Sequence, residues 1–382
     1  MPQAAAPRRQ ISGIRLFKVS GIQISIDFSW FIIFFLILWS LSAGYFPRKF
    51  PGENVQLYWL AGIISTLFFF SSVLIHELAH SLMAIRHGMK IHSITLFVFG
   101  GISSIEDEAK TPGSEFRIAI VGPLSSFALA GVFWLVRYGL GAVLPPLGLE
   151  VLWYLAFINL ALGIFNLIPG FPLDGGRVFR SIWWKWKGSL TQATKTASDI
   201  GKGFAYGLIF LGGIQILAGF LVGGIWFILI GLFLRSAAEG SYRELVLRQF
   251  LDNVKVRDVM IREMETVPPD LSLQKLVNDY ILKFGYKGFP VAKDGEVMGL
   301  VSIWNIKDIP EEERARRTVR EAMKGIEKDL LISPDASLTE ALRRMQSGGV
   351  GRLLVAEDGK VRGMITRTGL FRFIELKTVL QH

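Results

Sequence analysis

The sequence contains no cysteine, which excludes disulfide bonds and thiolate ligands, so any metal must be held by His, Asp or Glu. Charged residues are also scarce, at 19% of the chain, while hydrophobic residues make up 51%. The apolar residues are concentrated before position 250, whereas residues 251–382 have the composition of a water-soluble domain. No apolar h-region follows the first ten residues, so we expect no cleavable signal peptide.

Six apolar segments are predicted to span a membrane, because a spanning helix needs about 20 apolar residues. A net charge of +10 would suggest nucleic-acid binding in a soluble protein, but here it fits Lys- and Arg-rich cytoplasmic loops. We therefore expect a multi-pass protein in the lipid bilayer of the cell membrane, with both termini cytoplasmic and no nucleic-acid partner. The segments cover residues 27–45, 57–86, 116–138, 150–169, 203–222 and 224–239.

Two segments read as β structure on the cytoplasmic side. Residues 11–26 alternate in polarity and contain glycine at turn-like positions, which predicts short strands before the first span. Residues 89–106 are apolar, β-rich and interrupted by glycine, and they are too short for a helical hairpin. We interpret them as a re-entrant or interfacial β element, whose backbone must be shielded by protein.

The soluble part contains an internal repeat. VRDVM at 256–260 matches VREAM at 319–323, and DGEVMGLVS at 294–302 matches DGKVRGMIT at 358–366. Each copy reads as helix, strand, strand, helix, and such units need a partner to complete their core. We therefore expect a polytopic α-helical membrane domain followed by an α/β pair. The predicted divisions are a membrane domain at 1–240, a linker at 241–253 and repeats at 254–312 and 313–382.

The segment His76-Glu77-Leu78-Ala79-His80 predicts a zinc site. Positions i and i+4 share one helix face, so both imidazoles can reach one ion, and Glu77 can take a proton from its water. A chance match on a surface helix is the alternative. It is disfavoured because a charged residue at mid-bilayer costs about 2.5–3.5 kcal/mol, and this segment lies inside an apolar run.

A third ligand must come from elsewhere, and Asp174 is the candidate. Both the second and the fourth segment run toward the cytoplasm, so the two histidines and Asp174 arrive at a similar depth. The alternative is that Asp174 only caps the next helix. His87 and His92 lie just past the end of the second segment and read as interfacial or solvated residues, and His382 has no evident role.

The residues above resemble the site-2 protease family, the intramembrane zinc metalloproteases of regulated intramembrane proteolysis. The resemblance covers residues 11–235 and rests on the His76–His80 motif and on Asn166, Pro169 and Asp174 after the fourth segment. It extends to Gly122-Pro123 in the third. The repeats look like a tandem CBS pair, which occurs on one prokaryotic branch of this family.

The resemblance implies one zinc ion per chain, held by His76, His80 and Asp174, with Glu77 as the catalytic general base. It implies a transmembrane protein as substrate, contacted by Asn166 and Pro169. The β segment at 89–106, with Gly100 and Gly101, matches the membrane-reentrant element that pairs with unwound substrate. Family members often have Asn where this sequence has Ser126.

A CBS pair further implies an adenine nucleotide as regulatory ligand and a homodimer formed through the pairs. Nucleotide-binding CBS pairs often carry an acidic residue three positions after Ser or Thr, but this sequence has Asn305 after Ser302 and Gly369 after Thr366. Asn305 therefore stands as the candidate ribose contact, with a weaker hydrogen bond than a carboxylate would make. The alternative is that the pair serves only for dimerisation or for covering a gate.

Two other functions remain open from the sequence. A CBS-regulated ion transporter or channel would also carry His and carboxylate groups in its spans, but it would spread them over related halves with paired broken helices. No such halves are evident in the sequence, where these groups converge on one helical turn and Asp174. A catalytically idle binding protein is the other alternative, and the presence of Glu77 argues against it.

Overall fold

The computed structural model describes residues 13–98, 100–105 and 109–380, and they fall into two compact units, Met1–Leu245 and Val246–His382. The boundary between the units lies within the predicted linker 241–253. That stretch is helical, since it forms the end of the last long helix of the first unit. Each unit is described by itself.

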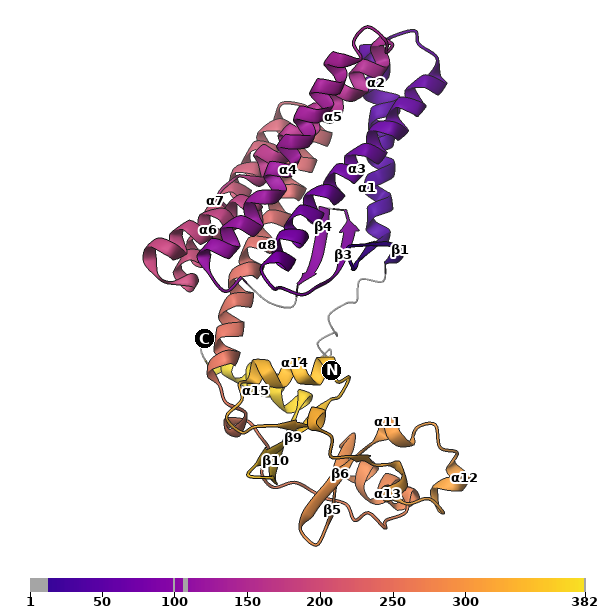
Figure 1. Cartoon of the computed structure of the whole chain (residues 1–382), viewed down its shortest axis with the longest axis vertical. Coiled ribbons are helices and arrows are strands. Elements are labelled where there is room, and N and C mark those ends of the chain that lie inside the picture. Colours follow the sequence, from indigo (N-terminus) through magenta and orange to yellow (C-terminus); the bar gives the residue numbers. More distant parts are fainter. Residues whose placement is uncertain (1–12, 99, 106–108, 381–382) are drawn as a thin grey trace. The chain divides into compact units, whose positions relative to one another are not determined.

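The described part of the first unit contains six helical segments that are long and apolar enough to cross a membrane, as predicted. Figure 1 shows these helices running beside one another, with a small sheet at one end. The first crossing is composite and contains a π-helical stretch, Ser40–Tyr45. The helices are α1 (Phe28–Trp39), α2 (Phe46–Lys49), α3 (Val55–Arg86), α4 (Pro112–Gly139), α5 (Pro146–Asn166), α6 (Asp174–Lys187), α7 (Leu190–Leu217) and α8 (Leu221–Asn253).

Local signals in the sequence explain where the long helices begin and end. Asn54 caps α3, because its side chain accepts a hydrogen bond from the Gln56 amide at 2.9 Å. Thr111 and Ser114 form a reciprocal capping box at the start of α4. The short helix α6 ends at Gly188, whose φ of 71° is in the left-handed region.

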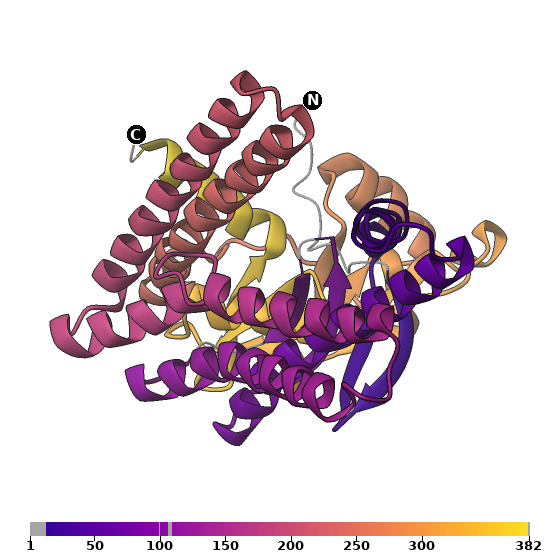
Figure 2. The same ribbon diagram turned by 90° about the horizontal axis from the view of Figure 1, so that it is seen from above.

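The last two spans form a close hairpin. A Cβ on Gly212 of α7 would lie 2.6 Å from the Gly224 carbonyl oxygen of α8, so only glycine permits this approach of the two backbones. Both helices are visible at the upper left of Figure 2. They run beyond the predicted segments, because α7 begins at Leu190 rather than 203 and α8 continues to Asn253 rather than 239.

Both predicted β segments are present and join in one four-stranded sheet in the order β1-β2-β3-β4. The β2–β3 pair is parallel and the other two pairs are antiparallel. Ile24 and Ile94 of this sheet are fully buried in a cluster with Ala84 of α3 and Ile118 of α4, so the sheet packs against the helices. The strands are β1 (Ile14–Val19), β2 (Ile22–Ile26), β3 (Ile91–Phe97) and β4 (Gly100–Ile105).

The second unit contains the two repeats, each with a helical segment, two antiparallel strands and a following helix. The first has α9 (Leu273–Lys275), a π-helical stretch at Leu276–Ile281, α10 (Leu282–Phe284), β5 (Gly288–Lys293), β6 (Glu296–Ser302) and α11 (Ile303–Ile306). The helix α12 (Glu311–Arg314) lies at the junction of the repeats, and the second repeat begins with α13 (Val319–Ala322) and β7 (Lys324–Gly325). The second has β8 (Leu331–Ile332), α14 (Leu338–Ser347), β9 (Arg352–Glu357), β10 (Lys360–Thr366) and α15 (Arg367–Leu380).

The repeats pack together by exchanging their leading segments. Val256, at the start of the first repeat, belongs to the core of the second, where its amide donates to the Ala336 carbonyl at 2.8 Å. Val319, at the start of the second repeat, belongs to the core of the first, where its amide donates to the Leu271 carbonyl at 2.8 Å. Each repeat therefore completes the hydrophobic core of the other, as the sequence predicted.

Candidate active site

The two histidines of the sequence motif lie one turn apart on α3, and their Nε2 atoms point toward the same place. His76 is 4% exposed and His80 is 7% exposed. Their Nε2 atoms lie 3.2 Å apart and their ring centroids 4.8 Å apart. The i to i+4 spacing thus places two potential metal-binding nitrogens together in a buried environment.

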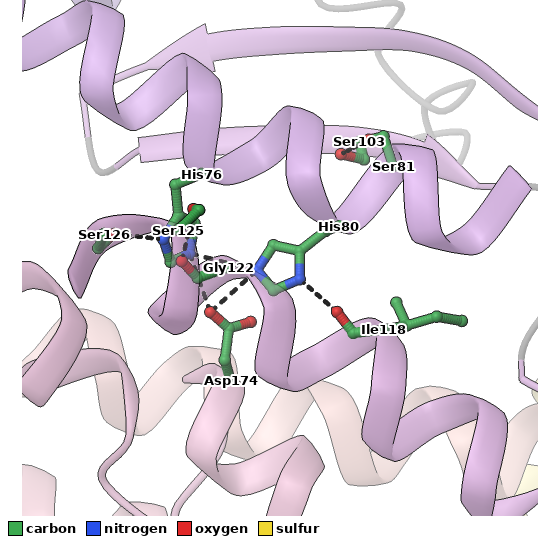
Figure 3. A network of polar contacts seen from close by, with 9 residues as sticks. All are labelled: His76, His80, Ser81, Ser103, Ile118, Gly122, Ser125, Ser126 and Asp174. Carbon is green, nitrogen blue, oxygen red and sulfur yellow. Dashed lines mark hydrogen bonds and ion pairs between the residues drawn. The ribbon is translucent and has the colours of Figure 1, made fainter. Parts of the chain in front are cut away.

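Asp174 approaches the same point from α6, close to a hundred residues further along the chain. Its Oδ2 lies 3.0 Å from His76 Nε2 and 3.1 Å from His80 Nε2 (Figure 3). The N-cap residue of α6 is Leu173, so Asp174 is not the capping residue. Its carboxylate contacts the imidazoles instead.

Glycines lock the segment that delivers Asp174. A Cβ on Gly176 would lie 2.5 Å from the amide nitrogen of Phe171, and a Cβ on Gly170 would lie 2.6 Å from the Gly201 Cα of α7. The Phe171 amide also donates to the Ala197 carbonyl of α7 at 3.1 Å. The turn between α5 and α6 is therefore folded tightly against both its own helix and α7, which fixes where α6 begins.

Helix α4 supplies the outer contacts of both imidazoles. His76 Nδ1 lies 2.9 Å from Ser126 Oγ, and His80 Nδ1 lies 2.6 Å from the Ile118 carbonyl oxygen. Because a carbonyl only accepts, His80 carries its hydrogen on Nδ1, which leaves Nε2 with a lone pair toward Asp174. Between these contacts, Gly122 leaves no room for a side chain, since a Cβ there would lie 2.7 Å from His76 Nε2.

Glu77 points to the small sheet. A Cβ on Gly101 of β4 would lie 2.7 Å from the Glu77 carboxyl carbon, so the strand backbone runs directly past this side chain. Strand β4 is the last in the sheet order, and its only strand partner in the described part of the chain is β3. Because a Cβ points out of a face of the sheet, the candidate general base lies against the face of β4 at Gly101.

The other predicted residues make no hydrogen bond to this cluster within the described part of the chain. Asn166 ends α5 and Pro169 lies in the turn before α6, and no hydrogen bond among the described residues joins either to the cluster. His87 ends α3 with its Nε2 buried and unpaired, and His92 is an exposed residue of β3. His382 lies outside the described residues.

Some contacts in the site were not predicted from the sequence. Ser126 was noted only as a departure from the family pattern, and a backbone carbonyl such as that of Ile118 leaves no mark in a sequence. A buried ion pair between Glu115 of α4 and Arg180 of α6 was also missed. The sequence did offer one signal for this pair: Glu115 lies close to the start of an apolar segment, and a carboxylate buried there needs a nearby cation.

The donor set fits zinc. Two imidazole nitrogens and one carboxylate oxygen, all within 4.8 Å of one another, match a catalytic zinc site that keeps its fourth position for water. Tetrahedral ligands at about 2.0–2.2 Å from zinc stand about 3.3–3.5 Å apart. The observed separations of 3.0, 3.1 and 3.2 Å lie slightly below that range. The outer contacts from α4 provide the support that ligating histidines require.

Comparison with known proteins agrees with this chemistry. Peptidase family M50 matches residues 64–144 and 147–209, and the CBS domain matches residues 256–312 and 319–376. Rip3 of Mycobacterium tuberculosis is 35% identical over 371 residues, which cover 96% of this chain and 94% of Rip3. This chain belongs to peptidase family M50. A relative from Methanocaldococcus jannaschii, named as a zinc metalloprotease, is 35% identical over 96% of this chain and 98% of its own length.

Among solved structures, a site-2 protease from Methanocaldococcus jannaschii is 32% identical, covers 60% of this chain and 95% of its own, and superposes with a TM-score of 0.42. Family membership and the relatives' names identify the chain as a zinc metalloprotease. With six apolar helices, it is a multi-pass membrane protein of the site-2 protease type that carries tandem CBS repeats. The predicted fold class and enzyme class are confirmed, and the ion-transporter and idle-binding alternatives are not retained.

Proposed function

We propose that this M50 protease hydrolyses peptide bonds in or near transmembrane segments of other proteins, with zinc held by His76, His80 and Asp174. The single observation that carries the proposal is the convergence of these three side chains from α3 and α6 among the apolar helices. Glu77, between the two histidines in sequence, is the general base. The substrate is a membrane protein because the site is built within spanning helices rather than in a soluble domain.

The proposed chemistry divides between the metal and the chain. Bound zinc supplies Lewis acidity and brings the pKa of its water to about 7. Glu77 accepts the proton of the attacking water and returns it to the leaving amine. His76 and His80 keep their Nε2 atoms directed at the metal through their contacts with α4, and Asp174 adds negative charge to the ligand set.

We propose that substrate binds as an extended strand along β4. A helix must be unwound before its peptide bonds can be hydrolysed, and an exposed strand edge offers the backbone hydrogen bonds that an unwound segment needs. The contact between Gly101 and Glu77 supports this placement, because a strand added to β4 would run close to the base. Gly100 and Gly101 are thus proposed substrate contacts, together with Asn166 and Pro169 near the turn before α6.

We propose that both termini and the active site face the cytoplasm. The connection between α5 and α7 is rich in Lys and Arg, as positive-inside topology requires. Four crossings separate it from the N-terminus, so both lie on one side. Because the chain has no cysteine, a single introduced cysteine is the only thiol, and its labelling shows on which side of the membrane it lies. In intact cells an impermeant thiol reagent should label Glu53→Cys and spare Lys185→Cys, and the opposite result would reverse the topology.

We propose that the CBS pair binds an adenine nucleotide. Arg352 of β9 is the repeat counterpart of Gly288 in β5, and its guanidinium lies against that glycine. Its Nη1 is buried and has no hydrogen-bond partner among the described residues, and burial lowers the pKa of Arg352. A phosphate group would accept the missing hydrogen bond and balance the charge. Asn305 is less suited to the ribose than expected, because its Oδ1 already accepts from the Ser302 amide at 2.9 Å.

Calorimetry on the full chain with ATP and AMP tests the nucleotide proposal. We expect binding that is lost in Arg352→Met and kept in Lys360→Met, which removes an exposed charge from the same sheet. Equal binding by the two variants would remove Arg352 from the site. Homodimer formation through the CBS pairs stays a prediction, tested by the mass of the detergent-solubilised chain with and without nucleotide.

Two variants test the protease proposal. Glu77→Gln should keep about one zinc per chain and abolish cleavage of a co-expressed membrane substrate, whereas Asp174→Ala should lose most of its zinc. Persistent cleavage in Glu77→Gln would refute the base assignment, and unchanged zinc in Asp174→Ala would remove that residue from the ligand set. The Glu77→Gln form also serves as a trap to capture substrates by co-purification.

A further inference from the structure

A buried ion pair between α4 and α6 has no part in the chemistry described above. Arg180 Nε donates to Glu115 Oε1 at 2.6 Å, and Arg180 Nη2 contacts the same oxygen. The Glu115 side chain is 1% exposed and that of Arg180 is 11% exposed. Two charges removed from water in this way require close, well-directed contact, because either one alone would be left uncompensated.

The pair joins the two helices that meet at the candidate metal site. Arg180 lies six residues after Asp174 on α6. Glu115 lies three residues before Ile118 on α4, the residue whose carbonyl holds His80. The ion pair therefore fixes the helix that carries the carboxylate ligand against the helix that orients an imidazole ligand.

Arg180 also holds the chain on the other side of Asp174. Its guanidinium carbon lies 5.0 Å from the centre of the Phe171 ring, in the turn that leads into α6. Its Nη1 donates to Thr194 Oγ1 of α7 at 3.4 Å. One side chain thus contacts the turn before Asp174, the neighbouring span and α4, and the planar guanidinium does this with directed N–H groups that lysine does not possess.

We infer that Glu115 and Arg180 are positioning residues that set the distance between the Asp174 carboxylate and the two imidazoles. The inference rests on the proposed function only in taking His76, His80 and Asp174 as the zinc ligands. Loss of the pair would let α6 shift relative to α4 and would alter the geometry of the ligand set without removing any ligand. Metal affinity and ligand geometry should therefore change while all three ligands remain.

The test uses the full-length protein in detergent, loaded with Co²⁺, whose visible spectrum reports the number and geometry of its ligands. We expect Arg180→Gln and Glu115→Gln to weaken metal binding by about 10- to 100-fold in chelator competition, the range for loss of outer-shell support, and to alter the Co²⁺ spectrum. Arg180→Lys should recover part of the affinity. Lys185→Gln, which removes an exposed charge from the same helix, should match the wild type.

A single substitution leaves one buried charge unpaired, so the double variant Glu115→Gln/Arg180→Met decides the matter if the single variants do not fold. Weakened affinity and an altered spectrum in the folded double variant support positioning. A wild-type affinity and spectrum there would overturn it. Asp174→Ala in the same assay separates the two claims: if it binds Co²⁺ like the wild type, the proposed ligand set fails, whatever the Arg180 variants do.

Discussion

Replacing Gly122 by alanine tests whether the candidate metal site needs a bare helix face behind its imidazoles. A Cβ at this position would lie 2.7 Å from His76 Nε2 and closer still to His80 Nε2. Non-bonded heavy atoms settle at about 3.5–4.0 Å, so both rings would have to retreat by about 1 Å. Their Nδ1 atoms are held on the same helix α4, so the retreat would also break those contacts.

The expected loss of stability in Gly122→Ala is small compared with the expected loss of activity, so the two effects can be told apart. Inserting a methyl group into a packed site costs about 1–3 kcal/mol, while alanine gains about 1 kcal/mol over glycine in a helix. The free energy of unfolding should thus fall by no more than about 2 kcal/mol. A misplacement of about 1 Å at a catalytic site costs about 100-fold in rate, and we expect a similar loss of zinc affinity.

The assay compares Gly122→Ala with Gly131→Ala on the same helix, where a Cβ would meet nothing within 4 Å. Zinc content by metal analysis, affinity by chelator competition and cleavage of a co-expressed substrate are measured on both. Gly131→Ala should behave as the wild type. Full zinc binding and activity in Gly122→Ala would refute the placement of His76 and His80 against this face of α4.

Gly101→Ala should lower kcat and leave zinc content unchanged, because its Cβ would lie 2.7 Å from the Glu77 carboxyl carbon and not at the metal ligands; lost zinc would contradict this. Ser126→Ala should weaken zinc affinity by about 10- to 100-fold by leaving His76 Nδ1 unsupported, as chelator competition will report. Burial raises the pKa of Glu340 but hydrogen bonds to two arginines lower it further, to a net decrease. Its stabilisation is therefore present above the unfolded pKa and lost as pH falls through the folded one. Glu340→Gln should lower the melting temperature at pH 7, and the difference from the wild type should shrink as the pH falls through the lowered pKa of the folded state; a constant difference would refute the linkage.

The spans were predictable from apolar runs, but their true lengths were not. Residues 190–202 contain Thr, Gln, Lys and Asp, which hide the start of α7 from a search for hydrophobic stretches. Ala193, Ala197 and Gly201 lie four residues apart on one face of α7 and are buried, and Ala197 and Gly201 contact Phe171 of the α5–α6 turn. Helical periodicity, rather than mean hydropathy, carried the information about this boundary.

In the site, the sequence indicated the three side chains that meet. The two histidines lie in a membrane span that does not otherwise tolerate such residues, and the predicted topology brings Asp174 to a similar depth. It did not indicate what holds them. The Ile118 carbonyl is common to every residue type, and the pairing of Glu115 with Arg180 depends on how α4 and α6 pack. For Asn305 the sequence pattern was misleading. Its position in the motif suggested a contact with a ligand, but its side-chain oxygen accepts a hydrogen bond at the start of α11.

The exchange of leading segments between the two C-terminal repeats has a consequence for how this region can vary. Truncation after the first repeat would remove the apolar neighbours of Val256, which lie in the second repeat. It would also remove Val319 from the core of the first repeat. Neither half is a free-standing module, so duplication, deletion or domain shuffling must act on both copies at once. We therefore expect a substitution that destabilises the core of one copy to destabilise the other copy as well.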